Sequence, residues 1–238
     1  MDTSTLSAGE RLIIALDTTE VEEAKAIIQE LDGVVSFFKI GLTLYLAGGH
    51  DLVQPLIDSN KRVFLDLKFY DIPETVKQAV SVAARQGITF LTVHGNREVL
   101  QYATEGKGSS DLEILLVTVL TSLDQEGLRE MGYGVTLEDL VLEKARTALE
   151  AGIGGVIASA REAGRIKEET GNKLLVISPG IRNDAATTDD QKRTMNAEDA
   201  IAAGADFLVV GRPITAQPDR RKAAIEHVEA IERGMSRV

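Results

Sequence analysis

The chain has 238 residues, of which 44% are hydrophobic, so it is long enough for one folded core and short for two full domains. Its 26 basic and 37 acidic residues give a formal net charge of -11, which argues against nucleic acid or an anionic membrane surface as the main partner. It has no cysteine, which excludes disulfides, thiolate catalysis and cysteine metal sites.

The first ten residues, MDTSTLSAGE, are polar and lack the pattern of a signal peptide. No apolar run in the chain approaches the roughly 20 residues that are needed to cross a bilayer. We therefore expect a cytoplasmic protein without a membrane segment. We also expect a flexible N-terminal extension over residues 1–10 and a single catalytic domain over residues 11–238.

From residue 12 onward, apolar strand-like runs alternate with segments of helical periodicity. In the first helical segment Val21, Ala24 and Ile28 share one face, and Thr19 and Glu22 have the spacing of a capping box at its start. The predicted strands are Leu12–Asp17, Phe37–Gly41, Val63–Lys68, Phe90–Gly95, Ile114–Leu120, Gly155–Ser159, Leu174–Gly180 and Phe207–Gly211. The later predicted helices are Thr75–Gln86, Thr136–Ala151, Ala197–Ala203 and Arg220–Arg233.

Eight strands that alternate with helices predict an α/β protein, a single-domain (β/α)8 TIM barrel, a fold that typically has about 250 residues. The strands are almost continuously apolar, as expected for a parallel sheet with both faces covered. A doubly wound open sheet is the alternative, but no GxGxxG motif follows an early strand. In a barrel, the active site lies at the carboxyl ends of the strands.

Charged side chains gather at these strand ends. Asp17 ends the first strand, Lys39 lies in the second, Asp66 and Lys68 lie at the end of the third, and Asp71 follows just beyond. Because side chains alternate along a strand, Asp66 and Lys68 should point the same way. A structural ion-pair network would explain one such pair. Five charges at one face instead favour chemistry on a charged small molecule, because packing them there costs desolvation energy.

The alternation of charges should keep the lysines protonated and the aspartates ionised. A protonated lysine cannot attack a carbonyl to form a Schiff base. A divalent cation bound by Asp17, Asp66 and Asp71 would lie beside two ammonium groups, which is unfavourable unless the lysines turn away. The pattern therefore favours a lysine that acts as a general acid over a Schiff-base lysine or a magnesium site.

A phosphate site is predicted after the eighth strand, where Gly211 lets the backbone approach an anion and Arg212 adds charge. The long polar segment from 180 to 195 is predicted to be a lid, from which Arg182 and Gln191 could reach a phosphate. An ordinary turn and a surface loop are the alternatives. The three histidines lack metal-ligand spacing, so we expect His94 to have a packed or hydrogen-bonded role rather than a catalytic one.

The stretch DLKFYDIPET at residues 66–75 resembles the signature of the orotidine 5'-phosphate decarboxylases. The other segments in the family's order and spacing are ALD ending at residue 17, FKIG around 39, VTVLTS at 117–122, PGIR at 179–182 and VVGRPIT at 209–215. This resemblance covers almost all of the chain beyond residue 10. It implies a decarboxylation of orotidine 5'-phosphate to uridine 5'-phosphate without cofactor or metal, the last step of pyrimidine nucleotide synthesis.

The resemblance also implies a role for each matching residue. Lys68 would donate the proton to the ring carbon that loses carbon dioxide, and Asp66 would lie beside the departing carboxylate. Lys39 and Asp17 would bind ribose hydroxyls and complete the charge network. The catalytic residue Asp71, with Thr75, would reach into the partner subunit's site, so a homodimer is expected. The other expected substrate contacts are Thr121 and Ser122 for the pyrimidine, and Arg182, Gln191, Gly211 and Arg212 for the phosphate.

Two residues depart from the family pattern: Glu74 and Tyr70 replace the more common asparagine and histidine. Neither belongs to the charged set, so they affect only local packing. The nearest rival function is a magnesium-dependent lyase or decarboxylase of sugar phosphates with the same barrel. Such relatives tend to have a glutamate ligand on the second strand, where this chain has Lys39. A nucleotide-binding barrel without catalysis is the non-enzymatic rival.

Overall fold

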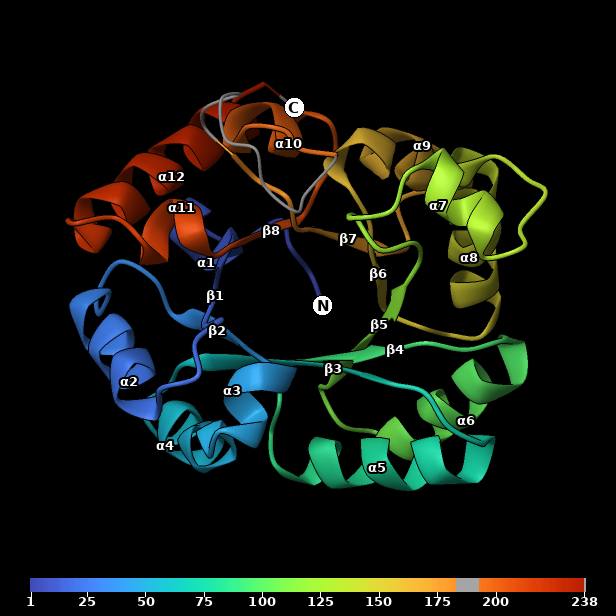
Figure 1. The fold of residues 1–238 in the computed structure, drawn as a ribbon, viewed down its shortest axis with the longest axis horizontal. Coiled ribbons are helices and arrows are strands. Elements are labelled where there is room, and N and C mark those ends of the chain that lie inside the picture. The colour runs from blue at the N-terminus through green and yellow to red at the C-terminus, as the bar shows by residue number, and fades with distance from the viewer. Residues whose placement is uncertain (183–192, 238) are drawn as a thin grey trace.

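The computed structural model describes residues 1–182 and 193–237. Within these residues, eight parallel strands close into a barrel in chain order, and helices surround it (Figure 1). The predicted (β/α)8 barrel is confirmed, and the open-sheet alternative is wrong because β1 (Leu12–Ala15) pairs with both β2 (Phe37–Gly41) and β8 (Phe207–Val210). No helix in the described part of the chain is long and apolar enough to span a membrane.

The other strands are β3 (Arg62–Phe69), β4 (Phe90–Val93), β5 (Glu113–Val117), β6 (Gly155–Ile157) and β7 (Leu175–Ser178). The helices are α1 (Ala8–Arg11), α2 (Val21–Glu30), α3 (Leu42–Leu46), the 3-10 helix η1 (Gly49–Leu52), α4 (Val53–Asp58), α5 (Pro73–Arg85), α6 (Arg97–Lys107), α7 (Gln125–Glu130), α8 (Leu137–Glu150), α9 (Ala160–Thr170), α10 (Ala197–Ala202), α11 (Arg212–Thr215) and α12 (Arg220–Met235).

All eight predicted strands are present, and five of them end two or three residues earlier than predicted. The difference arises because the functional residues after these strands belong to loops and are no longer paired in the sheet. The predicted capping box at α2 is wrong. The helix is capped at Glu20, and Thr18, rather than Thr19, accepts the Glu20 N–H and donates its hydroxyl to Glu23.

Apolar side chains fill the barrel interior at the amino end of the strands. Phe90 lies at its centre, with ring centroids 5.0 Å from Phe37, 5.1 Å from Phe207 and 5.9 Å from Phe64. All four rings are buried. A second, larger apolar cluster lies between the barrel and its helices. These two cores fix the strands whose opposite ends carry the polar side chains described below.

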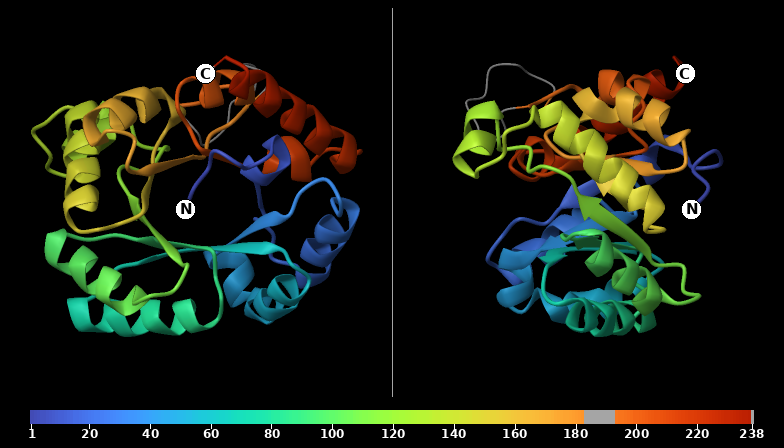
Figure 2. Two further views of the ribbon diagram at one scale, coloured as in Figure 1. Left: turned by 180° about the vertical axis from the view of Figure 1, so that it is seen from behind. Right: turned by 90° about the vertical axis from the view of Figure 1, so that its right-hand side faces the viewer.

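The N-terminal segment lies at the amino end of the barrel, away from α7 and the loops at the carboxyl ends (Figure 2). The amino group of Met1 is 2.6 Å from Glu113 Oε1, and Arg11 donates to the Thr3 carbonyl at 2.7 Å. Leu6 packs against the inner apolar cluster. The segment therefore closes the amino end of the barrel, whereas its flexibility stays a prediction.

Candidate active site

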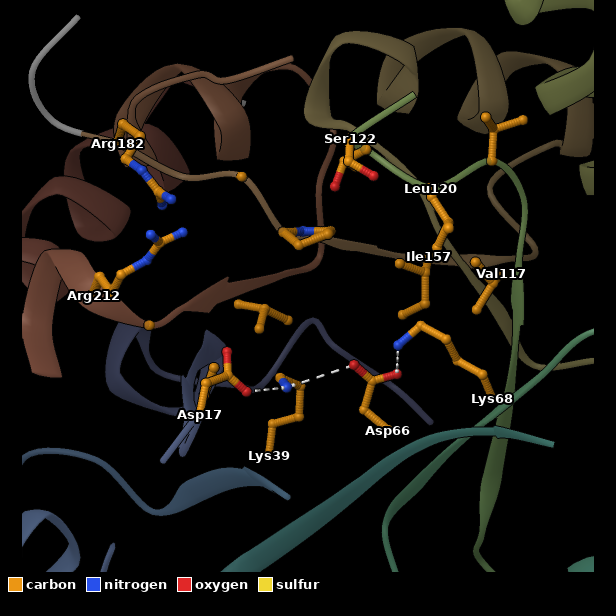
Figure 3. Close-up of a pocket in the computed structure, with 17 residues that line it drawn as sticks. Asp17, Lys39, Asp66, Lys68, Val117, Leu120, Ser122, Ile157, Arg182 and Arg212 are labelled. Carbon is orange, nitrogen blue, oxygen red and sulfur yellow. Dashed lines mark hydrogen bonds and ion pairs between the residues drawn. The ribbon is translucent and has the colours of Figure 1, made fainter. Parts of the chain in front are cut away.

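Four charged side chains form a continuous row across the carboxyl end of the barrel (Figure 3). Asp17 Oδ1 is 2.9 Å from Lys39 Nζ, which is also 3.5 Å from Asp66 Oδ2. The other oxygen of that carboxylate, Asp66 Oδ1, is 2.7 Å from Lys68 Nζ. Negative and positive groups thus alternate along the row, as the sequence predicted, and the ammonium of Lys68 ends it.

The centre of the row is buried and its ends are more open. The Lys39 side chain is 9% exposed and that of Asp66 17%, against 32% for Lys68. Burial opposes the charge of Lys39, but Asp66 and Asp17 outweigh it and raise the pKa of the ammonium. Burial likewise opposes the charge of Asp66, but Lys39 and Lys68 outweigh it and lower the pKa of the carboxyl. Both central groups are therefore ionised at neutral pH.

The predicted reason for the proximity of Asp66 and Lys68 is wrong. The pairing of β3 with β4 shifts register between Leu65 and Phe69, and Lys68 has a positive φ of 51°. A left-handed backbone at a residue with a side chain costs about 1–3 kcal/mol. It is the irregular strand, rather than the alternation of a regular one, that brings Lys68 Nζ to Asp66 Oδ1. Such local strain is typical of functional sites.

Thr92 on β4, which was not among the predicted site residues, contacts this irregular segment. Its side chain is fully buried, and its Oγ1 lies 2.9 Å from the Lys68 backbone nitrogen and 3.0 Å from Asp66 Oδ1. A sequence signal was available. Lys39, Asp66 and Thr92 each follow a buried inward-facing phenylalanine by two residues, namely Phe37, Phe64 and Phe90.

The row of charges forms the floor of a cavity of about 240 Å³. Apolar walls include Val117, Leu120 and Ile157, which lie on the Lys68 side. The guanidinium groups of Arg182 and Arg212 lie on the opposite side (Figure 3). The cavity therefore has a charged floor, an apolar wall beside Lys68 and a cationic end away from it. These features suit an elongated anionic ligand.

Nine of the predicted site residues line this cavity. They are Asp17, Lys39, Asp66, Lys68, Thr121, Ser122, Arg182, Gly211 and Arg212. Asp71 and Thr75 do not line it: both are exposed, and Asp71 Oδ1 accepts the N–H of Ile72 at 2.6 Å. Gln191 falls outside the described residues. The helix after Gly211, α11, has only four residues, so the arginines contribute more positive charge here than the helix dipole.

Arg193, where the described chain resumes, fixes the end of the 180–195 segment. Arg193 is 9% exposed; its Nη1 is 2.6 Å from Glu162 Oε1, and its Nη2 donates to the carbonyls of Val119 and Leu120 at 3.4 and 3.3 Å. The bond to Glu162 joins this segment to α9. The bonds to the two carbonyls tie it to the loop after β5, which carries Thr121 and Ser122. This contact between the two loops was not predicted from the sequence.

Among residues 1–182 and 193–237, no three His, Asp or Glu side chains are grouped as metal ligands are. The carboxylates of the row are separated by lysine: Lys39 Nζ lies between Asp17 and Asp66. The Lys39 ammonium thus pairs with both carboxylates. What the row can do chemically is hold a protonated lysine beside a bound ligand.

Comparison with known proteins gives one consistent family. The model of the orotidine 5'-phosphate decarboxylase / HUMPS family matches residues 10–226. A protein named orotidine 5'-phosphate decarboxylase from Nitrobacter winogradskyi is 50% identical over 217 residues, which are 91% of this chain and 90% of that protein. Another protein of that name, from Methylococcus capsulatus, is 46% identical over 221 residues, 92% of this chain and 90% of that one.

A solved structure agrees with the sequence relatives. The crystal structure of orotidine 5'-phosphate decarboxylase from Lactobacillus acidophilus is similar to this structure with a TM-score of 0.82 and 32% identity, covering 93% of this chain and 99% of that one. The chain therefore belongs to the orotidine 5'-phosphate decarboxylase / HUMPS family.

Proposed function

We propose that this protein decarboxylates orotidine 5'-phosphate to uridine 5'-phosphate and carbon dioxide, the last step of pyrimidine nucleotide synthesis. The relatives of that name support the reaction, since they match more than nine-tenths of the chain. The observation that carries the proposal is the row of alternating charges, which holds the Lys68 ammonium at one side of a cavity whose other side carries Arg182 and Arg212. A carboxylated ring with a distant phosphate fits this arrangement.

In the proposed reaction, the bond between the ring carbon and the carboxylate breaks, and carbon dioxide leaves. The electron pair stays on the ring carbon, where no adjacent π-system delocalises it. A fixed ammonium stabilises this charge as it develops, and Lys68 Nζ then gives its proton to the same carbon. Solvent returns a proton to the neutral lysine. Asp66 lies beside the departing carboxylate and holds the Lys68 ammonium in place.

The rest of the substrate is assigned to the other lining residues. Asp17 and Lys39 bind the ribose hydroxyls, and Thr121 and Ser122 contact the pyrimidine. Arg182, Gly211 and Arg212, with Gln191, bind the phosphate. The contact of Arg193 with the loop after β5 supports a coupling between the phosphate end and the pyrimidine end. Binding energy from the phosphate then helps to orient the ring at Lys68.

We propose that the active unit is a cytoplasmic homodimer in which Asp71 and Thr75 complete the partner's site. Both residues are exposed and lie outside the cavity of their own chain. Their neighbours Tyr70 and Ile72 are 72% and 67% exposed, which is unusual for large apolar side chains and supports burial against a second copy. A nucleotide substrate favours a cytoplasmic location.

Mixing of inactive variants tests the shared site. A mixed dimer of Lys68→Ala and Asp71→Ala chains has one site that lacks both residues and one that is whole. Random exchange at equal amounts should therefore restore about a quarter of the wild-type activity. A mixture of Lys68→Ala with Lys39→Met is the control, because both residues belong to one chain and no site is whole. No gain in the first mixture would refute the shared site.

The activity itself is tested by the loss of orotidine 5'-phosphate, followed by ultraviolet absorbance and by release of carbon dioxide. We expect turnover that is equal with and without an excess of chelator, since the proposed reaction uses no metal or cofactor. Turnover that the chelator abolishes would contradict the proposed chemistry. No turnover combined with tight binding of uridine 5'-phosphate would indicate a binding protein. If the protein neither turns over orotidine 5'-phosphate nor binds uridine 5'-phosphate, sugar phosphates should be tested as substrates with magnesium present.

A further inference from the structure

Three residues of β3 lie opposite a single residue of β4. Leu65 pairs with Leu91, and the next pairing joins Phe69 to Val93, so the segment from Asp66 to Lys68 faces Thr92 alone. Regular ladder hydrogen bonds cannot be made across such a mismatch. On its β4 side the segment therefore depends on other partners, while Asp66 still pairs with Gly41 of β2 on the other side. This segment carries Asp66 and Lys68, the two side chains that act at the reacting carbon in the proposed function.

Thr92 supplies these partners from one hydroxyl group. Its Oγ1 accepts the backbone N–H of Lys68 at 2.9 Å and donates to Asp66 Oδ1 at 3.0 Å. A hydroxyl has one donor and two acceptor positions, so it can make both bonds at once. The same Asp66 oxygen accepts the Lys68 ammonium at 2.7 Å. Thr92 thus contacts both ends of the pair, namely the backbone of the lysine and the carboxylate that orients its ammonium.

We infer that Thr92 is a positioning residue that holds the Asp66–Lys68 pair in its reactive geometry. The inference rests on the proposed function for its kinetic readout. Lys68 keeps a positive φ of 51°, a conformation that a lysine leaves readily once its N–H has no acceptor. A change of φ at Lys68 moves the whole side chain. A displacement of about 1 Å at a reacting group can cost a hundredfold in rate.

The hydroxyl also supports the charge of Asp66. Its hydrogen bond adds to the effects of Lys39 and Lys68, which lower the pKa of this carboxyl against the opposing effect of burial. Loss of the hydroxyl should therefore raise the pKa of Asp66 and move the acidic limb of the pH–rate profile to higher pH. A residue that only filled space in the barrel would not produce this shift.

Thr92→Val tests the inference, because valine keeps the shape and removes the hydroxyl. We expect its kcat to fall about ten- to a hundredfold, with KM and the affinity for uridine 5'-phosphate within about twofold of wild type. Thr92→Ser, which keeps the hydroxyl, should restore most of the activity. Thr118→Val is the matched control: Thr118 is also buried, and its hydroxyl bonds the Ile157 carbonyl at 2.8 Å, away from the pair.

A second readout needs no enzymatic activity. Labelling of lysines by an amine reagent, measured by peptide mass spectrometry, reports how firmly each ammonium is held. The rate at Lys68 relative to exposed Lys25 should rise several-fold in Thr92→Val and stay unchanged in Thr118→Val. Equal kcat and equal labelling in the two valine variants, or no rescue by serine, would overturn the inference. A wild type without turnover would refute the proposed function alone, because the labelling would still test Thr92.

Discussion

The two halves of the barrel interior use the same strands for different purposes. On β2, β3 and β4, an inward-facing phenylalanine is followed two residues later by a polar inward-facing residue. Phe37 precedes Lys39, Phe64 precedes Asp66 and Phe90 precedes Thr92. The amino half is thus an apolar core, whereas the carboxyl half, one pleat further along the strands, holds charges in a partly open cavity.

The difference between the halves shows where stability and chemistry are located. Burial of aromatic rings in the amino half stabilises the fold without contacting a ligand. Ion pairs in the carboxyl half offset their own desolvation at best, so they contribute little net stability but fix the positions of reactive groups. Substitutions in the two halves should therefore separate loss of activity from loss of fold.

The largest effect is expected at Lys68. Lys68→Ala removes the proposed proton donor, and turnover should fall by about 10²–10⁴-fold or more, since that is the range for loss of a general acid. The fold should persist, because Asp66 keeps its contact with Lys39 and the apolar half is unchanged. Rates followed by ultraviolet absorbance and thermal unfolding test both parts. Lys25→Ala, at an exposed lysine, is the control. Near-parental turnover of Lys68→Ala would contradict the proton-donor role.

A substitution in the amino half should have the opposite profile. Phe90 contacts three other rings, and Phe90→Ala should lower the free energy of unfolding by about 3–5 kcal/mol through lost burial and a cavity. The kcat of the molecules that remain folded should stay within about twofold, because Phe90 does not line the active cavity. Urea denaturation and active-site titration measure these quantities. Ile225→Ala, at a 41% exposed side chain on α12, should change stability by less than about 0.5 kcal/mol.

The alternation of apolar strands and helical segments was enough to predict the barrel and its order of strands. The four residues of the charged row were predicted from their positions in the strands or at strand ends, and all four line the cavity. The irregular backbone of β3 could not be predicted from this alternation. Lys68 reaches Asp66 through a register shift and a positive φ, and a period of two contains no information about either.

Helices α6 and α9 were not predicted. Both helices begin with a capping side chain: Asn96 accepts the N–H of Val99 in α6, and Ser159 accepts the N–H of Arg161 in α9. Each helix also buries one face, with Leu100 and Ala103 on α6 and Ala163 and Ile166 on α9, so its spacing was a second signal in the sequence. The Arg193 contact with the β5 loop could not be predicted either, since it joins segments more than 70 residues apart. Contacts of this kind depend on how two loops fold over one end of the barrel.

The smallest effect is expected from two histidines, His94 beside the charged half of the barrel interior and His227 on the outer helix α12. Burial lowers the pKa of His227, which packs on α12, and it lowers the pKa of His94, where the nearby Lys144 and Lys68 add to the effect. The unfolded chain therefore binds more protons than the fold below about pH 6.5, and stability should fall as the pH falls from 7.5 to 5.5. For each pH unit below about 6.5, the neutral His227 can lower the free energy of unfolding by up to about 1.4 kcal/mol. The effect at His94 is smaller, because this side chain is partly exposed and solvent screens its charge.

Urea unfolding at both pH values tests this for the wild type and for two single variants, His94→Gln and His227→Gln. Each variant should lose part of the pH dependence, with the larger loss at His227. Lys68→Ala should reduce the contribution of His94 alone, because it removes one of the positive charges that oppose protonation there. A pH dependence that is unchanged in His227→Gln would contradict the assignment. An effect of Lys68→Ala that persists in His94→Gln would show that the charged half affects stability by another route.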